Sequence, residues 1–342
     1  MIKTISNKNP FTLRGNWRYQ FRNLAWLLGA SVTVSARRVV HGPVRSGCSW
    51  GAETGIHFMR EQFLYAFCQR NIADGREYLD SLIFHSPALD RVKVDFVDEY
   101  VQGAWFTPPE LIDERPLLFF PGGGYVFLPV ATASLHALIA LATGRRLFAL
   151  TYPLAPEHPF PAQLVAAQRA IHWMTERQGI RLESLILGGA SAGGNLCLAM
   201  LLTLRDQGRA QPALAFLLSP WVDLTNSGAS MVANEPMDWI SKKTSDMASG
   251  WYCGREQADH RLVSPLYADL QDLAPIYIQA GGSEIFVDMI RAFAGRAGNQ
   301  GAQIQLDVWE KMIHCFQSFG DDIPEARAAL GQLGQVVNYG LS

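Results

Sequence analysis

The sequence predicts an α/β protein: a mostly parallel central sheet flanked by helices, with a helical region in front of it. From about residue 91 onwards, short apolar segments typical of strands alternate with segments of helical periodicity. Two of the apolar segments run directly into glycine-rich turns. Such turns lie at the carboxyl ends of parallel strands, where sheets of this class place their ligands.

Residues 1–90 are expected to form the helical N-terminal region, and residues 91–342 the α/β domain. Residues 50–69 have helical spacing, and 71–79 is predicted to be a short linking segment. Residues 92–96 alternate in polarity and predict a strand, with 100–106 as its hairpin partner. The remaining strands are predicted at 117–120, 147–152, 185–187, 213–218, 276–279 and 304–309, and the helices at 163–178, 195–205, 289–297 and 324–337. An insertion at about 227–261 is expected to join the N-terminal region as part of a cap.

The composition favours a globular protein that acts on small molecules. Apolar residues make up 49% of the 342 residues and charged residues 18%, which argues against disorder. The net charge is −2, and no Lys/Arg-rich run predicts a nucleic-acid surface. The five cysteines show no metal-ligand spacing, so we expect no metal and interpret them as free thiols in a reducing cytoplasm.

The N-terminus allows more than one interpretation. Basic residues, among them Lys3, Lys8 and Arg14, precede an apolar stretch at 24–34 that is too short to span a bilayer. It could belong to a signal peptide cleaved near residues 34–36. The alternative is an amphipathic helix that packs in the cap or touches a membrane surface. We expect a cytoplasmic protein without an integral membrane span.

The strongest functional motif is Gly189-Ala-Ser191-Ala-Gly193, which fits G-x-S-x-G between an apolar strand and an apolar helix. A serine at such a turn has a strained backbone, and only small neighbours let the turn close. The N-terminus of the helix that follows would stabilise negative charge that develops on a reacting group beside it. A glycine-rich turn that merely packs tightly is the alternative. We interpret Ser191 as a nucleophile.

A second motif, Pro121-Gly-Gly-Gly124, follows the strand at 117–120. Main-chain N–H groups of a glycine run can hold the oxyanion of a tetrahedral intermediate. A phosphate-binding loop would need a Lys and a Ser/Thr that are missing here. The run is therefore predicted to form an oxyanion hole.

A nucleophilic serine needs a base, and the base needs an orienting acid. His314 follows the last predicted strand, whereas His260 lies in a polar stretch typical of the surface. Glu284 and Asp288 both follow the strand at 276–279, and would share a face if a helix began there. Glu284 is preferred because it lies nearer the strand end.

Taken together, these segments resemble the hormone-sensitive lipase family of α/β-hydrolases. The glycine run is similar to its H-G-G-G, residues 152–162 (YPLAPEHPFPA) to Y-R-L-A-P-E-H-P-F-P-A, and 189–194 to G-D/T-S-A-G-G. Residues 218–225, 264–266 and 312–316 also match, and 38–45 and 48–50 look like the family's cap segment. The similarity extends from residue 37 nearly to the C-terminus.

The resemblance implies a serine carboxylesterase with an α/β-hydrolase fold and a catalytic triad of Ser191, Glu284 and His314, Asp288 being the second acid candidate. Its oxyanion donors would be the N–H groups of Gly123, Gly124 and Ala192. Short- to medium-chain carboxylic esters would be its substrates, without a cofactor. A homodimer through the sheet edge is a further expectation.

Three departures from the family pattern remove polar groups near the site: Pro121 replaces a His, Pro153 an Arg and Ala190 an Asp or Thr. They predict a specialised enzyme with an apolar pocket. Lactone opening, acyl transfer or dehydration within a biosynthetic pathway are alternatives that use the same residues. A non-catalytic small-molecule receptor is another, although such receptors generally lose a triad residue.

Overall fold

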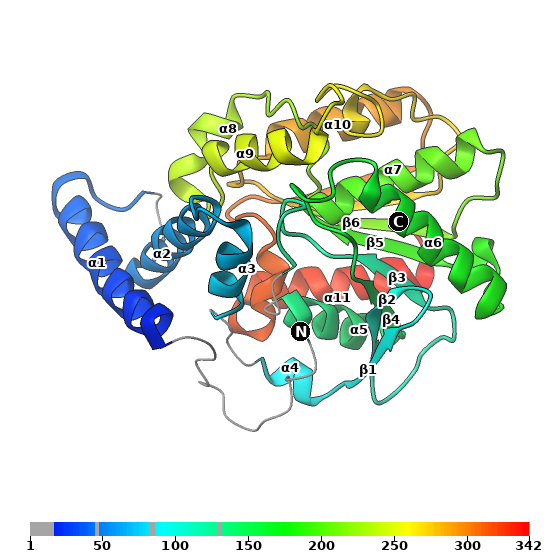
Figure 1. The fold of residues 1–342 in the computed structure, drawn as a ribbon, viewed down its shortest axis with the longest axis horizontal. Coiled ribbons are helices and arrows are strands. Elements are labelled where there is room, and N and C mark those ends of the chain that lie inside the picture. Colours follow the sequence, from blue (N-terminus) through cyan, green and yellow to red (C-terminus); the bar gives the residue numbers. More distant parts are fainter. Residues whose placement is uncertain (1–16, 45–47, 82–85, 129–131, 342) are drawn as a thin grey trace.

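A computed structural model describes residues 17–44, 48–81, 86–128 and 132–341. An eight-stranded sheet with strand order β1-β2-β4-β3-β5-β6-β7-β8 forms its centre (Figure 1). β1 (Lys93–Asp98) pairs antiparallel with β2 (Gln102–Thr107), and β2 pairs antiparallel with β4 (Leu147–Leu150). All other pairs are parallel. The predicted mostly parallel sheet is confirmed.

The central strands are buried on both faces because helices cover them. The parallel part of the sheet continues from β4 through β3 (Leu117–Phe120), β5 (Ile186–Ala190), β6 (Leu214–Leu218), β7 (Ile276–Gly281) and β8 (Ile304–Trp309). Along β3, Leu118 and Phe120 belong to one apolar core, and Leu117 and Phe119 to the other. This alternation follows from the two-residue period of a strand.

Each core has its own helices. The first core contains α6 (Ala162–His172), α7 (Ala192–Asp206) and α10 (Val287–Asn299), and the second α5 (Ala133–Thr143) and α11 (Pro324–Tyr339), with α4 (Pro87–Asp90) beside it. A π-helical turn, Trp173–Arg177, continues α6. Short 3₁₀ turns are at Leu182–Ser184, Glu235–Met237, Pro265–Tyr267 and Phe316–Asp322.

Five further helices lie outside these two layers or beside them. They are α1 (Trp17–His41), α2 (Trp50–Phe67), α3 (Ile72–Asp80), α8 (Ser230–Ala233) and α9 (Lys242–Cys253). α2 contacts α1, α3 and α9, so the N-terminal region and the 227–261 insertion meet (Figure 1). Their apolar residues continue the first core.

One detail of the sequence prediction is wrong. Residues 71–79 form most of α3 rather than a linking segment, with Asn71 capping the helix. The condition for a shared helical face of Glu284 and Asp288 is not met, because α10 begins at Val287 and Glu284 lies in the turn before it.

The N-terminal expectations are tested only in part. The apolar stretch at 24–34 is the middle of α1, and Val34, at the suggested cleavage site, is buried. Lys3, Lys8 and Arg14 lie outside the described residues. Within the described ranges, no helix combines the length and apolarity needed to cross a membrane.

Candidate active site

Ser191 occupies the sharp turn between β5 and α7. Its φ and ψ are 55° and −120°, a conformation that is costly for a residue with a Cβ. The glycines on either side are required by space: a Cβ on Gly189 would lie 2.2 Å from the Gly193 carbonyl oxygen, and a Cβ on Gly193 would lie 1.8 Å from that of Phe120. The strained turn leaves Ser191 only half-buried at the carboxyl end of the sheet.

The glycine run after β3 packs directly against this turn. A Cβ added to Gly122 would lie 3.3 Å from the Ser191 Cβ. Gly123 and Gly124 have φ values of 122° and 62°, which favour glycine. The Gly123 carbonyl accepts hydrogen bonds from the N–H groups of Val126 and Phe127, at 3.1 and 2.9 Å, and these fix the loop.

Three main-chain N–H groups beside Ser191 remain available. Within the described part of the chain, the N–H groups of Gly123 and Gly124 donate to no protein acceptor. Ala192 is the first residue of α7, and the first N–H groups of a helix have no partner within it. These are the three predicted oxyanion donors.

His314 lies in the loop after β8, and its side chain is 2% exposed. The ring packs edge-on against Phe286, with centroids 5.2 Å apart, and lies 5.6 Å from the ring of Trp239. The Trp239 indole N–H donates to the His314 carbonyl at 2.8 Å. The imidazole is therefore held in an aromatic surrounding.

Glu284, in the turn after β7, is fully buried beside this histidine. Its Oε2 accepts hydrogen bonds from the Ser219 hydroxyl at 2.6 Å and the Gly281 N–H at 2.9 Å. Its Oε1 lies 4.0 Å from Nδ1 of His314. Neither of these two atoms has a hydrogen-bond partner among the described residues.

Asp288, the other acid candidate, faces a different segment. Its carboxylate accepts a hydrogen bond from the Ser230 N–H at 2.8 Å, in the first turn of α8. None of its described contacts reaches His314. Only Glu284 of the two acids thus lies next to the imidazole.

The serine turn and the histidine loop meet at the end of β6. The Leu218 carbonyl accepts the Ser191 N–H at 2.9 Å, and the next residue, Ser219, accepts the Cys315 N–H on its hydroxyl at 3.0 Å. Among the described residues, no hydrogen bond joins the Ser191 hydroxyl to the imidazole. Cys315 is half-buried beside them, and its thiol lies 3.8 Å from the Leu218 carbonyl oxygen.

Electrostatics favours a protonated imidazole. Burial lowers the pKa of His314, but neighbouring Cys315 and the Glu284 carboxylate outweigh it, so that the pKa is raised well above its ordinary value. The Glu284 carboxylate can thus stabilise an imidazolium. This is the charge state that a general base passes through when it takes a proton.

Sequence reasoning missed Asp238, which follows the 3₁₀ turn Glu235–Met237 in the insertion. Its fully buried carboxylate accepts the N–H groups of His314 at 3.2 Å and Ile285 at 2.9 Å. Burial raises the pKa of this carboxyl to about 6. No motif marks Asp238, because the groups it binds are main-chain atoms distant in sequence.

The three residues that depart from the family pattern, Pro121, Pro153 and Ala190, have only uncharged groups in the contacts that follow. The carbonyl of Pro121 accepts the Tyr152 hydroxyl at 2.6 Å, and that of Pro153 accepts the Gln163 side-chain amide at 2.9 Å. Ala190 is buried.

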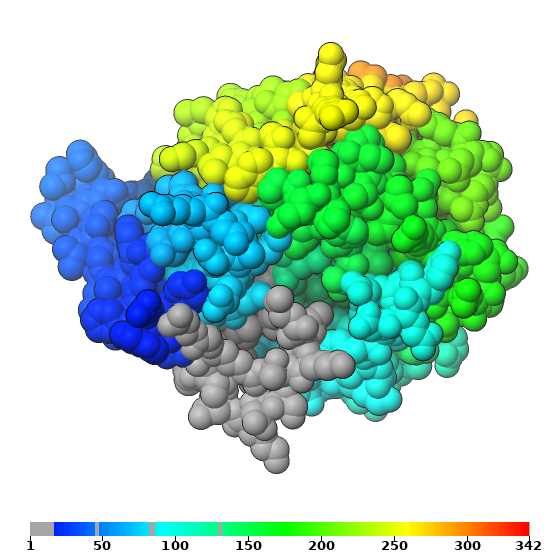
Figure 2. Space-filling model, in the orientation of Figure 1, coloured from blue at the N-terminus to red at the C-terminus, as the bar shows by residue number. Residues whose placement is uncertain are grey.

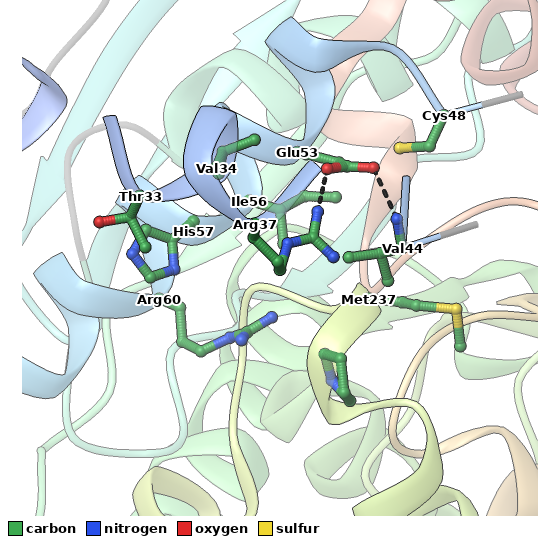
Figure 3. A pocket seen from close by; sticks show the side chains of 11 residues that line it. Thr33, Val34, Arg37, Val44, Cys48, Glu53, Ile56, His57, Arg60 and Met237 are labelled. Carbon is green, nitrogen blue, oxygen red and sulfur yellow. Dashed lines mark hydrogen bonds and ion pairs between the residues drawn. The ribbon is translucent and has the colours of Figure 1, made fainter. Parts of the chain in front are cut away.

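A cavity of about 170 Å³ lies between α1, α2 and the Pro236–Met237 segment (Figure 3). Arg37 and Glu53 form an ion pair in its wall, and Glu53 also accepts the Val44 N–H at 2.9 Å. The cavity is not lined by Ser191, Glu284 or His314. The described residues contain no group of three or more side chains that could hold a metal ion.

Residues 117–318 match the family described as alpha/beta hydrolase fold. An acetyl-hydrolase of Streptomyces hygroscopicus is 35% identical over 234 residues, which cover 67% of this chain and 77% of that protein. An esterase of Acinetobacter venetianus is 31% identical and covers 64% of this chain and 73% of its own length.

Solved structures show the same similarity in three dimensions. The crystal structure of an esterase from the bacterial hormone-sensitive lipase family superposes with a TM-score of 0.79 at 33% identity, covering 86% of this chain and 100% of that one. A hormone-sensitive lipase from a metagenome library gives a TM-score of 0.78 at 28% identity, over 85% and 98% of the two chains.

Proposed function

Because this chain belongs to the hormone-sensitive lipase family of α/β-hydrolases and is an esterase-type hydrolase, we propose that it cleaves small to medium apolar carboxylic esters through an acyl-enzyme on Ser191. One observation carries this proposal. Ser191 lies on a strained turn against a glycine loop in which the N–H groups of Gly123 and Gly124 have no acceptor among the described residues. Such a pairing of hydroxyl and donors suits a tetrahedral oxyanion.

In the proposed reaction, His314 accepts the Ser191 hydroxyl proton as the oxygen attacks the ester carbonyl carbon. The N–H groups of Gly123, Gly124 and Ala192 bind the oxyanion. When the intermediate collapses, the imidazolium gives its proton to the departing alcohol, and the acyl group stays on Ser191. Water then attacks the acyl-enzyme by the same route and releases the acid.

Glu284 has the role of orienting the imidazole and stabilising its charge. The 4.0 Å between Oε1 and Nδ1 is longer than a hydrogen bond. Catalytic hydrogen bonds often shorten only in the complex with substrate. We therefore expect Oε1 and Nδ1 to move within hydrogen-bond distance when substrate binds.

The apolar substrate preference rests on the aromatic side chains of the cap. Phe63 of α2 lies edge-on to Trp239, with centroids 4.8 Å apart, and Trp239 in turn faces His314. Phe67 of α2 similarly lies against Trp251 of α9. Transfer of an apolar acyl group from water into this aromatic surrounding would lower the free energy of the enzyme–substrate complex. We expect bulkier p-nitrophenyl esters or lactones to be turned over better than p-nitrophenyl acetate.

Labelling with a fluorophosphonate tests the nucleophile, since only an activated serine reacts. The wild-type chain should be labelled once, on the peptide that contains Ser191, and hydrolysis of p-nitrophenyl butyrate should stop as labelling completes. Ser191→Ala should lose both labelling and hydrolysis while keeping the wild-type circular dichroism spectrum and Tm. Ser184→Ala, a change at a serine in a 3₁₀ turn before β5, is the matched control and should behave as wild type. Hydrolysis by Ser191→Ala at a rate near that of the wild type would reject the proposal.

A further inference from the structure

α1 presents an apolar stripe to solvent along its whole length. We call this the outer stripe; its residues follow one another at helical spacings of three, four or seven. Its members, with their exposed fractions, are Trp17 (70%), Phe21 (71%), Leu24 (58%), Leu28 (61%), Val32 (69%) and Val39 (88%). Single exposed apolar residues are ordinary, but a row from Trp17 to Val32 that resumes at Val39, after the exposed Ser35, is a feature that requires an explanation.

The opposite side of α1 already has its packing partners. The buried residues Asn23, Ala30 and Val34 lie about half a turn from the outer stripe. Asn23 accepts a hydrogen bond from the Tyr78 hydroxyl of α3 at 2.5 Å, and Tyr19 lies edge-on to the same ring. The inner side thus fixes α1 on α2 and α3, and the outer stripe contributes nothing to that contact.

α1 also forms an outer edge of the molecule. In Figure 1 it lies beyond α2, on the side away from the sheet, and in Figure 2 its blue atoms border open space. Among the described residues, α1 is thus accessible from the side away from the sheet.

The charged side chains of the N-terminal 52 residues are all positive. The first 52 residues contain eight Lys or Arg and no Asp or Glu, whereas the other 290 carry 21 Lys or Arg against 31 Asp or Glu. The eight cations are Lys3, Lys8, Arg14, Arg18, Arg22, Arg37, Arg38 and Arg45. Arg37 is paired with Glu53, and Lys3, Lys8, Arg14 and Arg45 lie outside the described residues. The partner of the outer stripe is accordingly expected to be anionic.

We propose that α1 docks on the surface of an anionic lipid bilayer, lying in the plane of the headgroups with the outer stripe inserted. Helices of this kind combine Trp, Phe and Leu on one side with Arg or Lys beside them. Burial of the stripe supplies the apolar contribution and anionic lipids supply the opposite charge. The helix lies on the membrane rather than across it, since it is not apolar enough to span.

A second copy of the chain fits the outer stripe less well. In a symmetric dimer the same patch meets itself, so the two cation-rich N-terminal regions would be brought together. Like charges across an interface oppose association. Only a surface of opposite charge satisfies both the apolar and the cationic features.

Vesicle sedimentation with the full chain tests the proposal. The wild-type protein should bind vesicles of equal parts phosphatidylcholine and phosphatidylglycerol, bind pure phosphatidylcholine more weakly, and be released in part by high salt. The double substitution Phe21→Ser/Leu28→Ser should lower the partition coefficient by about tenfold or more. Both side chains are exposed, so the Tm should stay close to that of the wild type.

The matched control is Val232→Ser/Tyr339→Ser, which removes an aliphatic and an aromatic side chain that are 67% and 86% exposed on α8 and α11. It should bind anionic vesicles as the wild type does. The proposal is overturned if the wild type stays in the supernatant, or if the outer-stripe variant sediments equally. Light scattering that shows a wild-type dimer, made monomeric by Phe21→Ser/Leu28→Ser with no vesicle binding, would instead assign the stripe to self-association. None of these readouts depends on esterase activity.

Discussion

The buried carboxylate of Asp238 accepts a hydrogen bond from the main-chain N–H of His314 at 3.2 Å. Its other oxygen accepts the N–H of Ile285, the residue after Glu284, at 2.9 Å. One side chain thus joins the loops of the proposed acid and base. Its own carbonyl is held by the guanidinium of Arg60 on α2, which connects the cap to both loops.

Asp238→Asn should lower kcat without a matching rise in KM. The carboxylate accepts the N–H groups of His314 and Trp239 on one oxygen and that of Ile285 on the other. The amide keeps one acceptor oxygen but turns an N–H₂ group toward the donors on one side, so one loop loses its anchor. Small displacements of catalytic groups can cost up to about 100-fold, and we expect a loss of about tenfold or more. The rate of fluorophosphonate labelling should fall in parallel. If kcat and labelling stay at wild-type values, Asp238 has no positioning role.

The Asp238 carboxyl should also make the free energy of unfolding depend on pH. Burial raises its pKa from 3.8 to about 6, so the folded state holds a proton that the unfolded state has released. Between about pH 4 and pH 6 this makes the free energy of unfolding decrease as pH rises. The slope in Asp238→Asn, measured by urea unfolding across this window, should be less negative than in the wild type. Equal slopes would mean that the carboxyl titrates alike in both states.

Glu284→Gln and Asp288→Asn should differ widely in activity. Replacing the orienting carboxylate by an amide in a serine hydrolase leaves the imidazole in the wrong tautomer and costs about 10⁴ in kcat. Glu284→Gln should show a loss of that order. Asp288 accepts a hydrogen bond from α8 instead, so its change to Asn should reduce kcat by less than about tenfold. If Asp288→Asn lost more kcat than Glu284→Gln, Asp288 rather than Glu284 would be the acid that orients His314.

The acid limb of the pH–rate profile should lie at unusually high pH. A general base must be neutral, so kcat/KM should fall as pH decreases through the pKa of His314. That pKa is raised above its ordinary value of 6.5 because the contributions of Cys315 and Glu284 exceed the opposing effect of burial. Glu284→Gln removes the carboxylate that stabilises the imidazolium and should move the limb to lower pH. A wild-type limb below 6.5 would contradict this assignment.

The sequence could predict those parts of the molecule whose signals are local. Ser191 and the glycine loop are short motifs at strand ends, and the sheet, fold and family that they indicated are confirmed. Helix α3 was missed because Gly75 lowers helix propensity. The structure gives the reason for this glycine: a Cβ there would lie 2.3 Å from the Ala66 carbonyl oxygen of α2.

Asp238 could not be predicted for a different reason. Its partners are main-chain N–H groups at positions 285 and 314, which any residue type supplies, so nothing in the sequence of the insertion signals the contact. The roles of Ser191, Glu284 and His314 stay predictions, because they depend on reactivity as well as position.

The packing between the serine turn and the glycine loop predicts opposite effects for two glycine-to-alanine substitutions. A Cβ on Gly193 would lie 1.8 Å from the carbonyl oxygen of Phe120 and 2.6 Å from that of Pro121, both backbone atoms. Gly193→Ala must therefore push the helix start away from the loop, and should lower both Tm and kcat. Gly331→Ala on α11 meets nothing within 4 Å and should raise stability by about 0.5–1 kcal/mol, through the higher helix propensity of Ala, at unchanged kcat. Thermal unfolding and p-nitrophenyl butyrate kinetics on the two variants separate the cases. If Gly193→Ala keeps wild-type kcat, the contact between loop and turn is dispensable for the proposed oxyanion hole.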